Sequence, residues 1–240
     1  MEAVWRHPGK EEMRGLFTRI AGRYDALNRA LTFGIDVVWR RRALAMLARA
    51  AEPRRILDLA TGTADLAIGA ARRFASARVV GVDLTPAMLA RGREKARRAG
   101  VEGRVDLVEG NASALAFPSG AFDAVTCAFG FRNFPDVERA LEEAGRVLRP
   151  GGVLLVLELF RMESRLFARA TSGWLRLVAP LLARARREDY AYLRRSIERT
   201  LTADDFAARA ARAGFAREEG AFFPPSCHCL LLRKCGRMCP

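Results

Sequence analysis

Two acidic side chains and one amide stand at the ends of short apolar runs in this 240-residue chain, where they could bind a nucleoside. Asp58 and Asp83 each end such a run, 25 residues apart, and Asn111 follows a third run. A carboxylate at the end of a second parallel strand can accept hydrogen bonds from both hydroxyls of a ribose, and an amide after the third strand can bond an adenine edge. The pattern predicts a nucleoside-cofactor site.

The stretch DLATGTADLA forms the turn after the first run. Its small residues Ala60, Gly62 and Ala64 let backbone amides approach a ligand, and the start of the following helix favours a carboxylate or phosphate. Such a turn is as often structural as ligand-binding, so Asp83 and Asn111 decide its interpretation. It lacks the G-x-G-x-x-G pattern of dinucleotide sites, which disfavours NAD.

A second chemical feature is the pair Arg132-Asn133 in CAFGFRNFPD, directly after a fourth apolar run. Burying a guanidinium without a partner is expensive, so Arg132 needs either a solvated rim, a partner or a ligand. One interpretation places it at the ligand edge of the sheet as a fixed cation. The other pairs it with Asp136 or Glu138 in the first turn of the next helix.

These side chains require a sheet that brings the ends of successive strands together. Short apolar runs alternate with segments of helical periodicity, which predicts right-handed βαβ units and an α/β fold with a doubly wound, Rossmann-like parallel sheet. We expect a helix to begin at Thr85-Pro86 and another to end at Pro150-Gly151-Gly152. The expected strands are residues 55–60, 77–84, 105–110, 122–130 and 151–160.

The chain divides into four expected parts. They are a helical N-terminal cap (1–50), the cofactor-binding α/β core (51–160), a helical cap or insertion over the substrate site (161–212), and C-terminal strands with a cysteine-rich tail (213–240). A segment in the third part has a hydrophobic face that includes Trp174 and a basic end. Its plain interpretation is packing on the core, and its functional one is a lid over an apolar substrate or a lipid contact.

Composition indicates a globular chain, with 50% hydrophobic and 28% charged residues, and the first residues lack the apolar core of a secretion signal. We therefore expect a cytoplasmic protein, with membrane association as a further option. The net charge of +14 suits nucleic acid, an anionic membrane surface or anionic small molecules. It suits equally well basic, solvated helix faces such as RGREKARRAG.

Four of the five cysteines lie in the last 14 residues, in SCHCLLLRKCGRMCP. Cys227, His228, Cys229, Cys235 and Cys239 offer soft ligands, but their spacing matches no standard zinc site. The alternation in CHCLLLRKC fits a final strand with cysteine as a small hydrophobe, so we expect no metal.

The motifs LDLATGTADL, VGVDLTPAML, EGNASALAFPSGAFDAV and RVLRPGGVLLVLE resemble those of class I S-adenosylmethionine methyltransferases. More narrowly, FTRIAGRYDALNRALTFG, FGFRNFPD and YLRRSI resemble the ubiquinone/menaquinone biosynthesis C-methyltransferase family of UbiE/MenG type. The resemblance covers residues from about 16 to 215. It implies a seven-stranded sheet with a reversed last hairpin, S-adenosyl-L-methionine as cofactor, and methylation of a ring carbon on a polyprenylated benzoquinol or naphthoquinol.

The resemblance also implies the site residues. Methylation at a ring carbon requires a quinol oxyanion, which Arg132 can stabilise while orienting a water and Asn133 holds the geometry. Tyr24 and Asp25 are expected to close over the substrate, although Asp25 suits a helix cap equally well. The implied cofactor residues are Asp58, Ala60, Gly62, Thr63, Asp83, Leu84, Asn111, Ala112 and Ala128.

The sequence departs from the family pattern at several positions. Ala128 stands where a serine is common, Thr61 and Ala64 replace glycines, and Asp36 replaces a histidine. Arg194-Arg195 replace a less basic pair. The positions of Asp36 and this pair are expected to line the substrate side.

Rival functions are a methyltransferase for another small molecule or RNA, and a cofactor-binding scaffold without activity. Methyltransferases of this fold that act on the amino groups of nucleic-acid bases usually carry an Asn or Asp, two prolines and an aromatic residue after the fourth strand. This chain has FGFRN there. Asp58, Asp83, Asn111, Arg132 and Asn133 are all present together, which disfavours a scaffold without catalytic activity. We expect a polyprenylated quinol as substrate, peripheral contact with a membrane, no nucleic acid, and a homodimer.

Overall fold

The computed structural model describes residues 9–161, 173, 195–197, 199–223 and 227–235. Its centre is a seven-stranded sheet in the order β3-β2-β1-β4-β5-β7-β6. The strands are β1 Arg55–Leu59, β2 Arg78–Asp83, β3 Val105–Glu109, β4 Phe122–Ala128, β5 Leu148–Glu158, β6 Phe215–Phe223 and β7 Cys227–Lys234. Strands β1 to β5 pair in parallel, and β7 runs antiparallel to both neighbours. The predicted sheet with its reversed last hairpin is confirmed.

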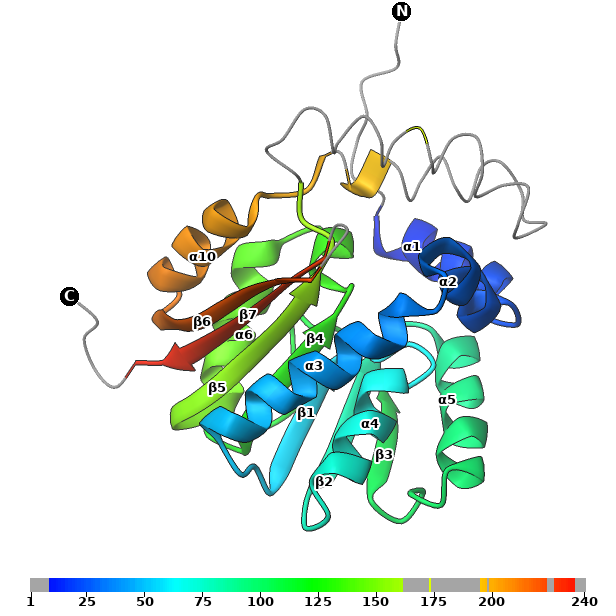
Figure 1. The fold of residues 1–240 in the computed structure, drawn as a ribbon, viewed down its shortest axis with the longest axis horizontal. Coiled ribbons are helices and arrows are strands. Elements are labelled where there is room, and N and C mark those ends of the chain that lie inside the picture. Colours follow the sequence, from blue (N-terminus) through cyan, green and yellow to red (C-terminus); the bar gives the residue numbers. More distant parts are fainter. Residues whose placement is uncertain (1–8, 162–172, 174–194, 198, 224–226, 236–240) are drawn as a thin grey trace, which may run out of the picture.

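Helices cover both faces of the sheet (Figure 1). The helices are α1 Lys10–Ile20, α2 Tyr24–Thr32, α3 Ile35–Ala50, α4 Asp65–Arg73, α5 Pro86–Arg98, α6 Val137–Val147 and α10 Ala203–Arg212, with the 3-10 turn η1 Phe131–Asn133. Helices α3, α4 and α5 share one hydrophobic core with one face of the sheet, and α6 and α10 share the other. Along each strand, successive side chains point to opposite faces of the sheet, as the pleat requires.

The N-terminal helices differ in how they contact this framework. Helix α3 buries Trp39, Leu44 and Leu47 in the same core cluster as α4 and β1, so it is a layer of the core itself. Helices α1 and α2 lie above the carboxyl ends of the strands, with α1 beside α5 (Figure 1). The Trp174 face and most of the expected cap at 161–212 lie outside the described residues.

Two helix boundaries test the sequence interpretation. Helix α5 begins at Pro86 with Thr85 as its N-cap, as predicted. The predicted helix end at Pro150-Gly151-Gly152 is wrong, because α6 ends at Val147 and β5 already begins at Leu148. Two features favour the strand. Arg149 precedes Pro150, and a residue before proline prefers extended backbone. Leu148 also pairs with Phe122 of β4, just before a register shift.

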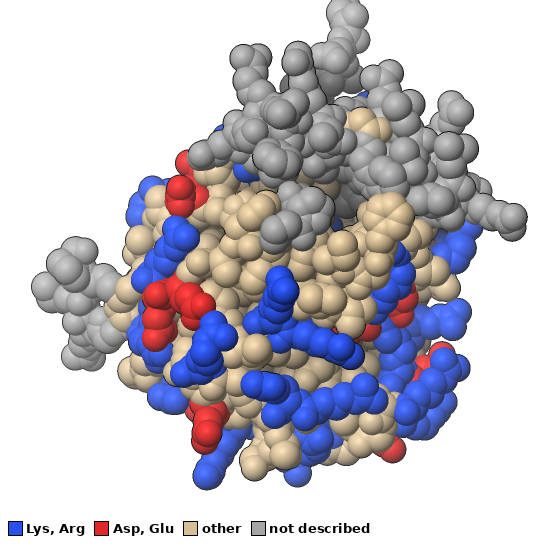
Figure 2. Space-filling model, viewed as in Figure 1, with Lys and Arg blue, Asp and Glu red and all other residues tan. Residues whose placement is uncertain are grey.

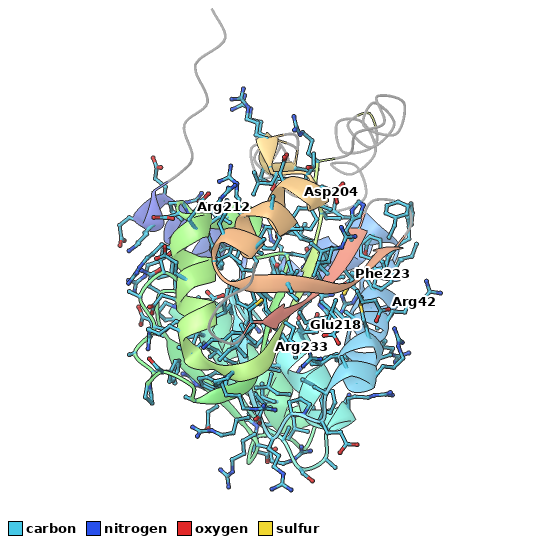
Figure 3. All side chains as sticks on the ribbon, turned by 90° about the vertical axis from the view of Figure 1, so that its left-hand side faces the viewer. Arg42, Asp204, Arg212, Glu218, Phe223 and Arg233 are labelled. Carbon is cyan, nitrogen blue, oxygen red and sulfur yellow. The ribbon has the colours of Figure 1, made fainter. Side chains whose placement is uncertain are left out.

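The C-terminal hairpin closes the edge of the sheet. Strand β7 places the thiols of Cys227 and Cys229 in the core beside α3, both fully buried. The prediction of a final strand with cysteine as a small hydrophobe is confirmed. Arg233 on β7 pairs with Glu218 of β6 and donates to the Gly151 carbonyl at 2.8 Å, which ties β6, β7 and β5 together (Figure 3). Within the described residues, no helix has the length and apolar character needed to cross a membrane.

Gly130, just after β4, allows the closest approach between this strand end and the turn after β1. An added Cβ would stand 2.6 Å from Cys127 Sγ and 2.8 Å from Ala60 Cβ, closer than real Cβ contacts allow. We predict that Gly130→Ala lowers the free energy of unfolding by about 1–3 kcal/mol in urea denaturation. Gly103→Ala is the matched control, because its Cβ would meet nothing within 4 Å. Equal stability of both variants would contradict this account.

Candidate functional site

A cavity of about 800 Å³ opens at the carboxyl ends of β1, β2, β3 and β4, under α1 and α2. It combines apolar walls with a few convergent polar groups, as small-molecule sites do. Seven of the nine predicted cofactor residues line it: Ala60, Gly62, Asp83, Leu84, Asn111, Ala112 and Ala128. The other two, Asp58 and Thr63, line a smaller cavity of about 310 Å³ that shares Tyr24, Ala60, Gly62 and Ala128 with the first.

The turn after β1 is held in an unusual backbone conformation. Ala60, Gly62 and Ala64 all have positive φ, at 49°, 55° and 65°. Only glycine adopts this region without cost, so each alanine carries about 1 kcal/mol of strain. The Thr61 N–H donates to the Val82 carbonyl at 3.0 Å, which fastens the turn to β2 and keeps its backbone at the cavity wall.

Asp83 lies at the end of β2 and faces this turn. One carboxylate oxygen accepts the Gly62 N–H at 2.9 Å and the other accepts the Thr85 N–H at 2.9 Å. Burial raises the pKa of Asp83, and the two N–H donors offset part of that rise. Each oxygen retains a lone pair for a further donor, so a carboxylate fixed in this way can receive two hydroxyls of a ligand.

Asp58 lies deeper, in the centre of the sheet. Its two oxygens accept the hydroxyls of Thr61 and Thr126, each at 2.6 Å, and the side chain is 1% exposed. Burial raises its pKa to about 6 despite these hydroxyls and the nearby Arg40 cation. Asp58 thus holds the turn against β4, at the wall of the smaller cavity.

The third element is the turn after β3. Asn111 accepts the Ser113 N–H with its side-chain oxygen at 3.1 Å, and the preceding Gly110 N–H donates to the Asp83 carbonyl at 3.0 Å. The amide group of Asn111 is therefore oriented from its own backbone turn, and Ala112 beside it leaves space. Both line the large cavity.

Arg132 and Asn133 form the 3-10 turn after β4, but Arg132 pairs with a residue that the sequence did not indicate. Its Nη1 donates to Glu158 Oε1 at 2.5 Å and to the Phe129 carbonyl at 2.8 Å. Glu158, the last residue of β5, is fully buried. Asn133 donates to the same Phe129 carbonyl at 3.2 Å and lines the large cavity.

The two alternative partners considered for Arg132 are engaged elsewhere. Asp136 caps α6 by accepting the Arg139 N–H at 2.8 Å, and Glu138 pairs with Arg209 of α10. The cation predicted at the strand end is thus balanced by an acid from the adjacent parallel strand.

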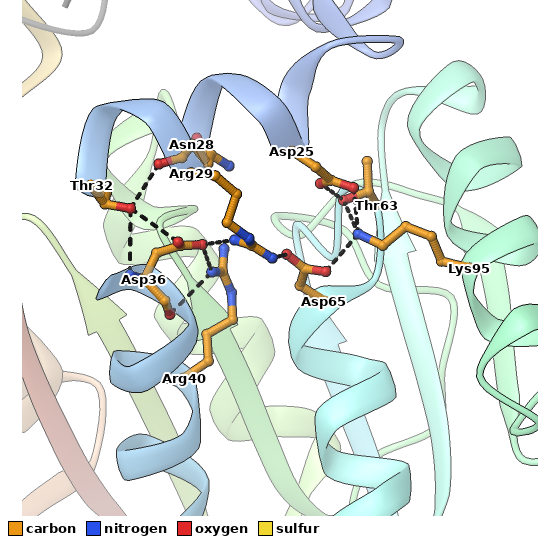
Figure 4. A network of polar contacts seen from close by, with 9 residues as sticks. All are labelled: Asp25, Asn28, Arg29, Thr32, Asp36, Arg40, Thr63, Asp65 and Lys95. Atoms are coloured by element: carbon orange, nitrogen blue, oxygen red, sulfur yellow. Dashed lines mark hydrogen bonds and ion pairs between the residues drawn. The ribbon is translucent and has the colours of Figure 1, made fainter. Parts of the chain in front are cut away.

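Tyr24 and Asp25 begin α2, over the turn after β1. Tyr24 lines both cavities. Asp25 accepts the Thr63 hydroxyl and the Lys95 ammonium, both at 2.6 Å. It is not the helix cap, because the N-cap of α2 is Arg23. Lys95 also donates to Asp65 at 2.5 Å, which connects α2, α4 and α5 (Figure 4).

The polar network continues from Asp65 toward α3. Arg29 on α2 donates to Asp65 at 3.0 Å and to Asp36, and Arg40 donates to Asp36 as well. Burial would raise the pKa of Asp65, but the nearby cations Lys95, Arg40 and Arg29 outweigh it and lower that pKa. Asp36 is 1% exposed within this network, and it lies outside the lining of both cavities.

Several cavity and network residues were absent from the sequence prediction. Met13 and Phe17 of α1 close the large cavity, and an ordinary amphipathic helix carries no signal for that role. Lys95 lies in a run that suits a solvated basic face. Its position on α5 becomes informative only when Asp25 and Asp65 are known to stand opposite it.

Comparison with known proteins decides the family. The model of the ubiE/COQ5 methyltransferase family matches residues 6–222. The chain belongs to this family. A demethylmenaquinone methyltransferase of Thermus thermophilus is 48% identical over 203 residues, which cover 83% of this chain and 91% of that protein. A ubiquinone/menaquinone biosynthesis C-methyltransferase UbiE of Geobacter sulfurreducens is 40% identical over 208 residues, covering 85% and 81%.

Solved structures agree on the fold of this methyltransferase. The cyclase SpnF aligns with a TM-score of 0.69 over 97% of this chain and 99% of its own, at 18% identity. A SAM dependent methyltransferase from Aquifex aeolicus aligns with a TM-score of 0.60 over 80% and 89%, at 15% identity. At these identities the likeness concerns the fold alone.

The family departures have distinct structural settings. Ala128 lines both cavities at the end of β4, so the absent hydroxyl leaves a methyl group at the wall. Thr61 uses its hydroxyl to hold Asp58, and Ala64 packs its buried side chain near Gly92. Among the described residues, no group of three or more His, Cys, Asp or Glu side chains is placed to hold a metal ion.

The buried Asp58 generates a pH prediction. Its folded pKa of about 6 lies above the usual 3.8, so the folded state binds more protons and stability is lost as pH rises through about 4 to 6. Asp58→Asn removes this loss, which amounts to about 3 kcal/mol. We expect the stability of the variant relative to wild type to rise from pH 4 to pH 7 in urea unfolding.

The exposed carboxyl of Asp106 on β3 offers the matched change, Asp106→Asn. If the difference in stability between Asp58→Asn and wild type stays constant from pH 4 to pH 7, burial does not raise the pKa of Asp58.

Proposed function

We propose that this methyltransferase uses S-adenosylmethionine to methylate a ring carbon of a polyprenylated quinol in respiratory quinone biosynthesis. Demethylmenaquinol and the corresponding ubiquinol precursor are the proposed substrates. Family membership and the names of the two relatives above support the reaction class. The observation that carries the proposal is Asp83, a carboxylate fixed by two backbone N–H groups at the wall of the large cavity.

The residues of the large cavity fit the proposed cofactor. Asp83 would accept the ribose hydroxyls, and Asn111 would bond the adenine edge beside the small side chain of Ala112. Leu84 and Met88 supply apolar surface for the ring. The backbone of Ala60 and Gly62, held close to the cavity by the left-handed turn, would adjoin the methionine end.

The smaller cavity supplies the other two predicted contacts. Asp58 and Thr63 line it together with the cation of Arg40. An amino acid carries both an ammonium and a carboxylate, so a cavity that offers charges of both signs suits the methionine end of the cofactor. The two cavities share the Ala60–Gly62 wall, which makes them parts of one site.

Bound S-adenosylmethionine would supply an electrophilic methyl group, with its sulfur as leaving group, in place of the proton that the ring carbon loses. The protein must then hold the two carbons in line and favour the quinol oxyanion that makes the ring nucleophilic. Arg132 remains a cation at any ordinary pH, so it serves as a fixed positive group and not as the base. Glu158 fixes its position behind the cavity wall, since Arg132 itself lines neither cavity. Asn133 and Tyr24 present polar groups to the large cavity.

The polyprenyl tail gives the substrate a membrane-resident end, so we also propose peripheral contact with a membrane. The expected homodimer stays a prediction, which a measured mass in solution would check.

The cofactor assignment predicts the effect of Asp83→Ala. Two charge-assisted hydrogen bonds to the ribose are lost, so affinity for S-adenosylmethionine should fall at least about 10- to 100-fold in calorimetric titration. Asp106→Ala, an exposed carboxyl on the neighbouring strand, should bind as wild type does. Unchanged affinity of Asp83→Ala would refute the assignment.

The Arg132 assignment predicts a separation of binding from turnover. Arg132→Ala alone strands the buried Glu158, which costs about 3–5 kcal/mol of stability. The sharper variant is therefore Arg132→Ala with Glu158→Gln. We expect it to keep cofactor affinity and lose most turnover, whereas equal loss of both would make Arg132 structural.

Substrate class is tested directly with methyl-labelled S-adenosylmethionine. Purified protein is incubated separately with demethylmenaquinol, the demethylated ubiquinol precursor and total tRNA. Label in a quinol is the expected result. Label only in tRNA would overturn the proposal, and tight cofactor binding with no label in any substrate would indicate a scaffold.

A further inference from the structure

The outer face of α3 has a composition unlike that of a solvated helix. Ile35 and Val38 are 38% and 41% exposed, and Arg41 and Arg42 are exposed one turn further along. At about 100° per residue these four side chains lie within an arc of about 120°. The opposite arc, which includes Trp39, packs on the core. The apolar start of the exposed face is thus followed directly by a basic section.

Phe33, in the turn before α3, extends the apolar section. It is 68% exposed, the highest value among the exposed large hydrophobic residues described. Phe33 and Gly34 both adopt the left-handed conformation, with φ of 51° and 75°. A bulky residue rarely adopts this conformation, and here the aromatic ring is exposed directly before the start of α3.

The charge around this surface is positive. Figure 2 shows Lys and Arg side chains gathered over the face formed by α3, α4 and α5. Among the described residues, neither Arg41 nor Arg42 forms a salt bridge, and Figure 3 shows Arg42 at the margin of the molecule near Phe223. An apolar tip bordered by cations is complementary to an anionic lipid surface, where apolar groups enter the interface and cations meet headgroups.

We propose that Phe33, Ile35, Val38, Arg41 and Arg42 form a docking surface for an anionic phospholipid bilayer. The inference rests on the proposed function, because a polyprenylated substrate is delivered from a membrane. Tyr24 and Phe33 stand at the two ends of α2, about 13 Å apart along the helix axis. Docking through Phe33 therefore brings the cavity wall formed by Tyr24 close to the lipid that holds the substrate tail.

The surface is tested by co-sedimentation of the full chain with vesicles of phosphatidylcholine, with and without phosphatidylglycerol. Phe33→Asn removes the ring and keeps a residue that tolerates the left-handed turn. Arg41→Glu with Arg42→Glu reverses the charge. We expect each variant to lower partitioning onto anionic vesicles at least about tenfold, with little wild-type binding to pure phosphatidylcholine.

Matched controls place the same changes elsewhere. Val108→Asn removes an apolar side chain that is 38% exposed on β3, and Arg78→Glu with Arg212→Glu reverses two exposed cations outside α3, α4 and α5. Both should bind vesicles within about twofold of wild type. Equal losses in the controls would show that net charge alone drives binding, and no wild-type binding to anionic vesicles would exclude the surface. Either result overturns the proposal.

A second readout separates this inference from the proposed function. With a short-tailed, water-soluble quinol and no vesicles, Phe33→Asn and the double arginine variant should turn over as wild type does, while activity on a long-tailed quinol in anionic vesicles should fall with their binding. Equal loss with both substrates would assign these residues to folding or chemistry and refute docking. If wild type methylates neither quinol, the proposed function fails, and the vesicle partitioning alone decides the docking surface.

Discussion

The position of α2 over the turn after β1 depends on an alternating chain of charges. Three carboxylates, from Asp25, Asp65 and Asp36, alternate with three cations, from Lys95, Arg29 and Arg40, and the six charges sum to zero. The chain crosses four helices that are separate in sequence (Figure 4). Asp36 is buried and Asp65 largely so, and each contacts two cations. Loss of one cation would leave both carboxylates with a partner but would give this largely buried network a net negative charge, which costs more than a surface pair contributes. The network therefore specifies where α2 lies.

A second constraint acts on the other side of the turn. Asp58 accepts hydroxyls from the turn and from β4, and Asp83 accepts an N–H from the turn. One buried and one half-buried acid thus hold a backbone that carries strain at both alanines. Strained conformations persist only where surrounding contacts determine them fully. The strand ends thus form a fixed base of the site. Helix α2 covers that base and is held in place by the ion pairs.

The sequence predicted the parts of the site that follow from local pattern. Apolar runs mark the strand ends, so the sequence alone places Asp83 and Asn111 at one edge of a parallel sheet. It does not indicate the partner of Arg132, because Glu158 reads as the last residue of a buried strand 26 positions later and only the pairing of β4 with β5 brings it near. Lys95 was hidden for the same reason, within a run of arginines. The early start of β5 shows that a strand can continue past a proline and two glycines, because Leu148 and Val153 pair with β4 while the residues between them lie at a register shift.

The buried thiols described above give the protein internal reporters of local opening. Cys127, Cys227 and Cys229 are free, and burial raises the pKa of each thiol, that of Cys229 to about 12. Only a thiolate reacts readily with an alkylating reagent, so in the closed sheet all three are protected. Cys127 lies on a central strand and the other two on the C-terminal hairpin. The order in which they become labelled would therefore distinguish detachment of the hairpin from opening of the central strands, without any engineered residue.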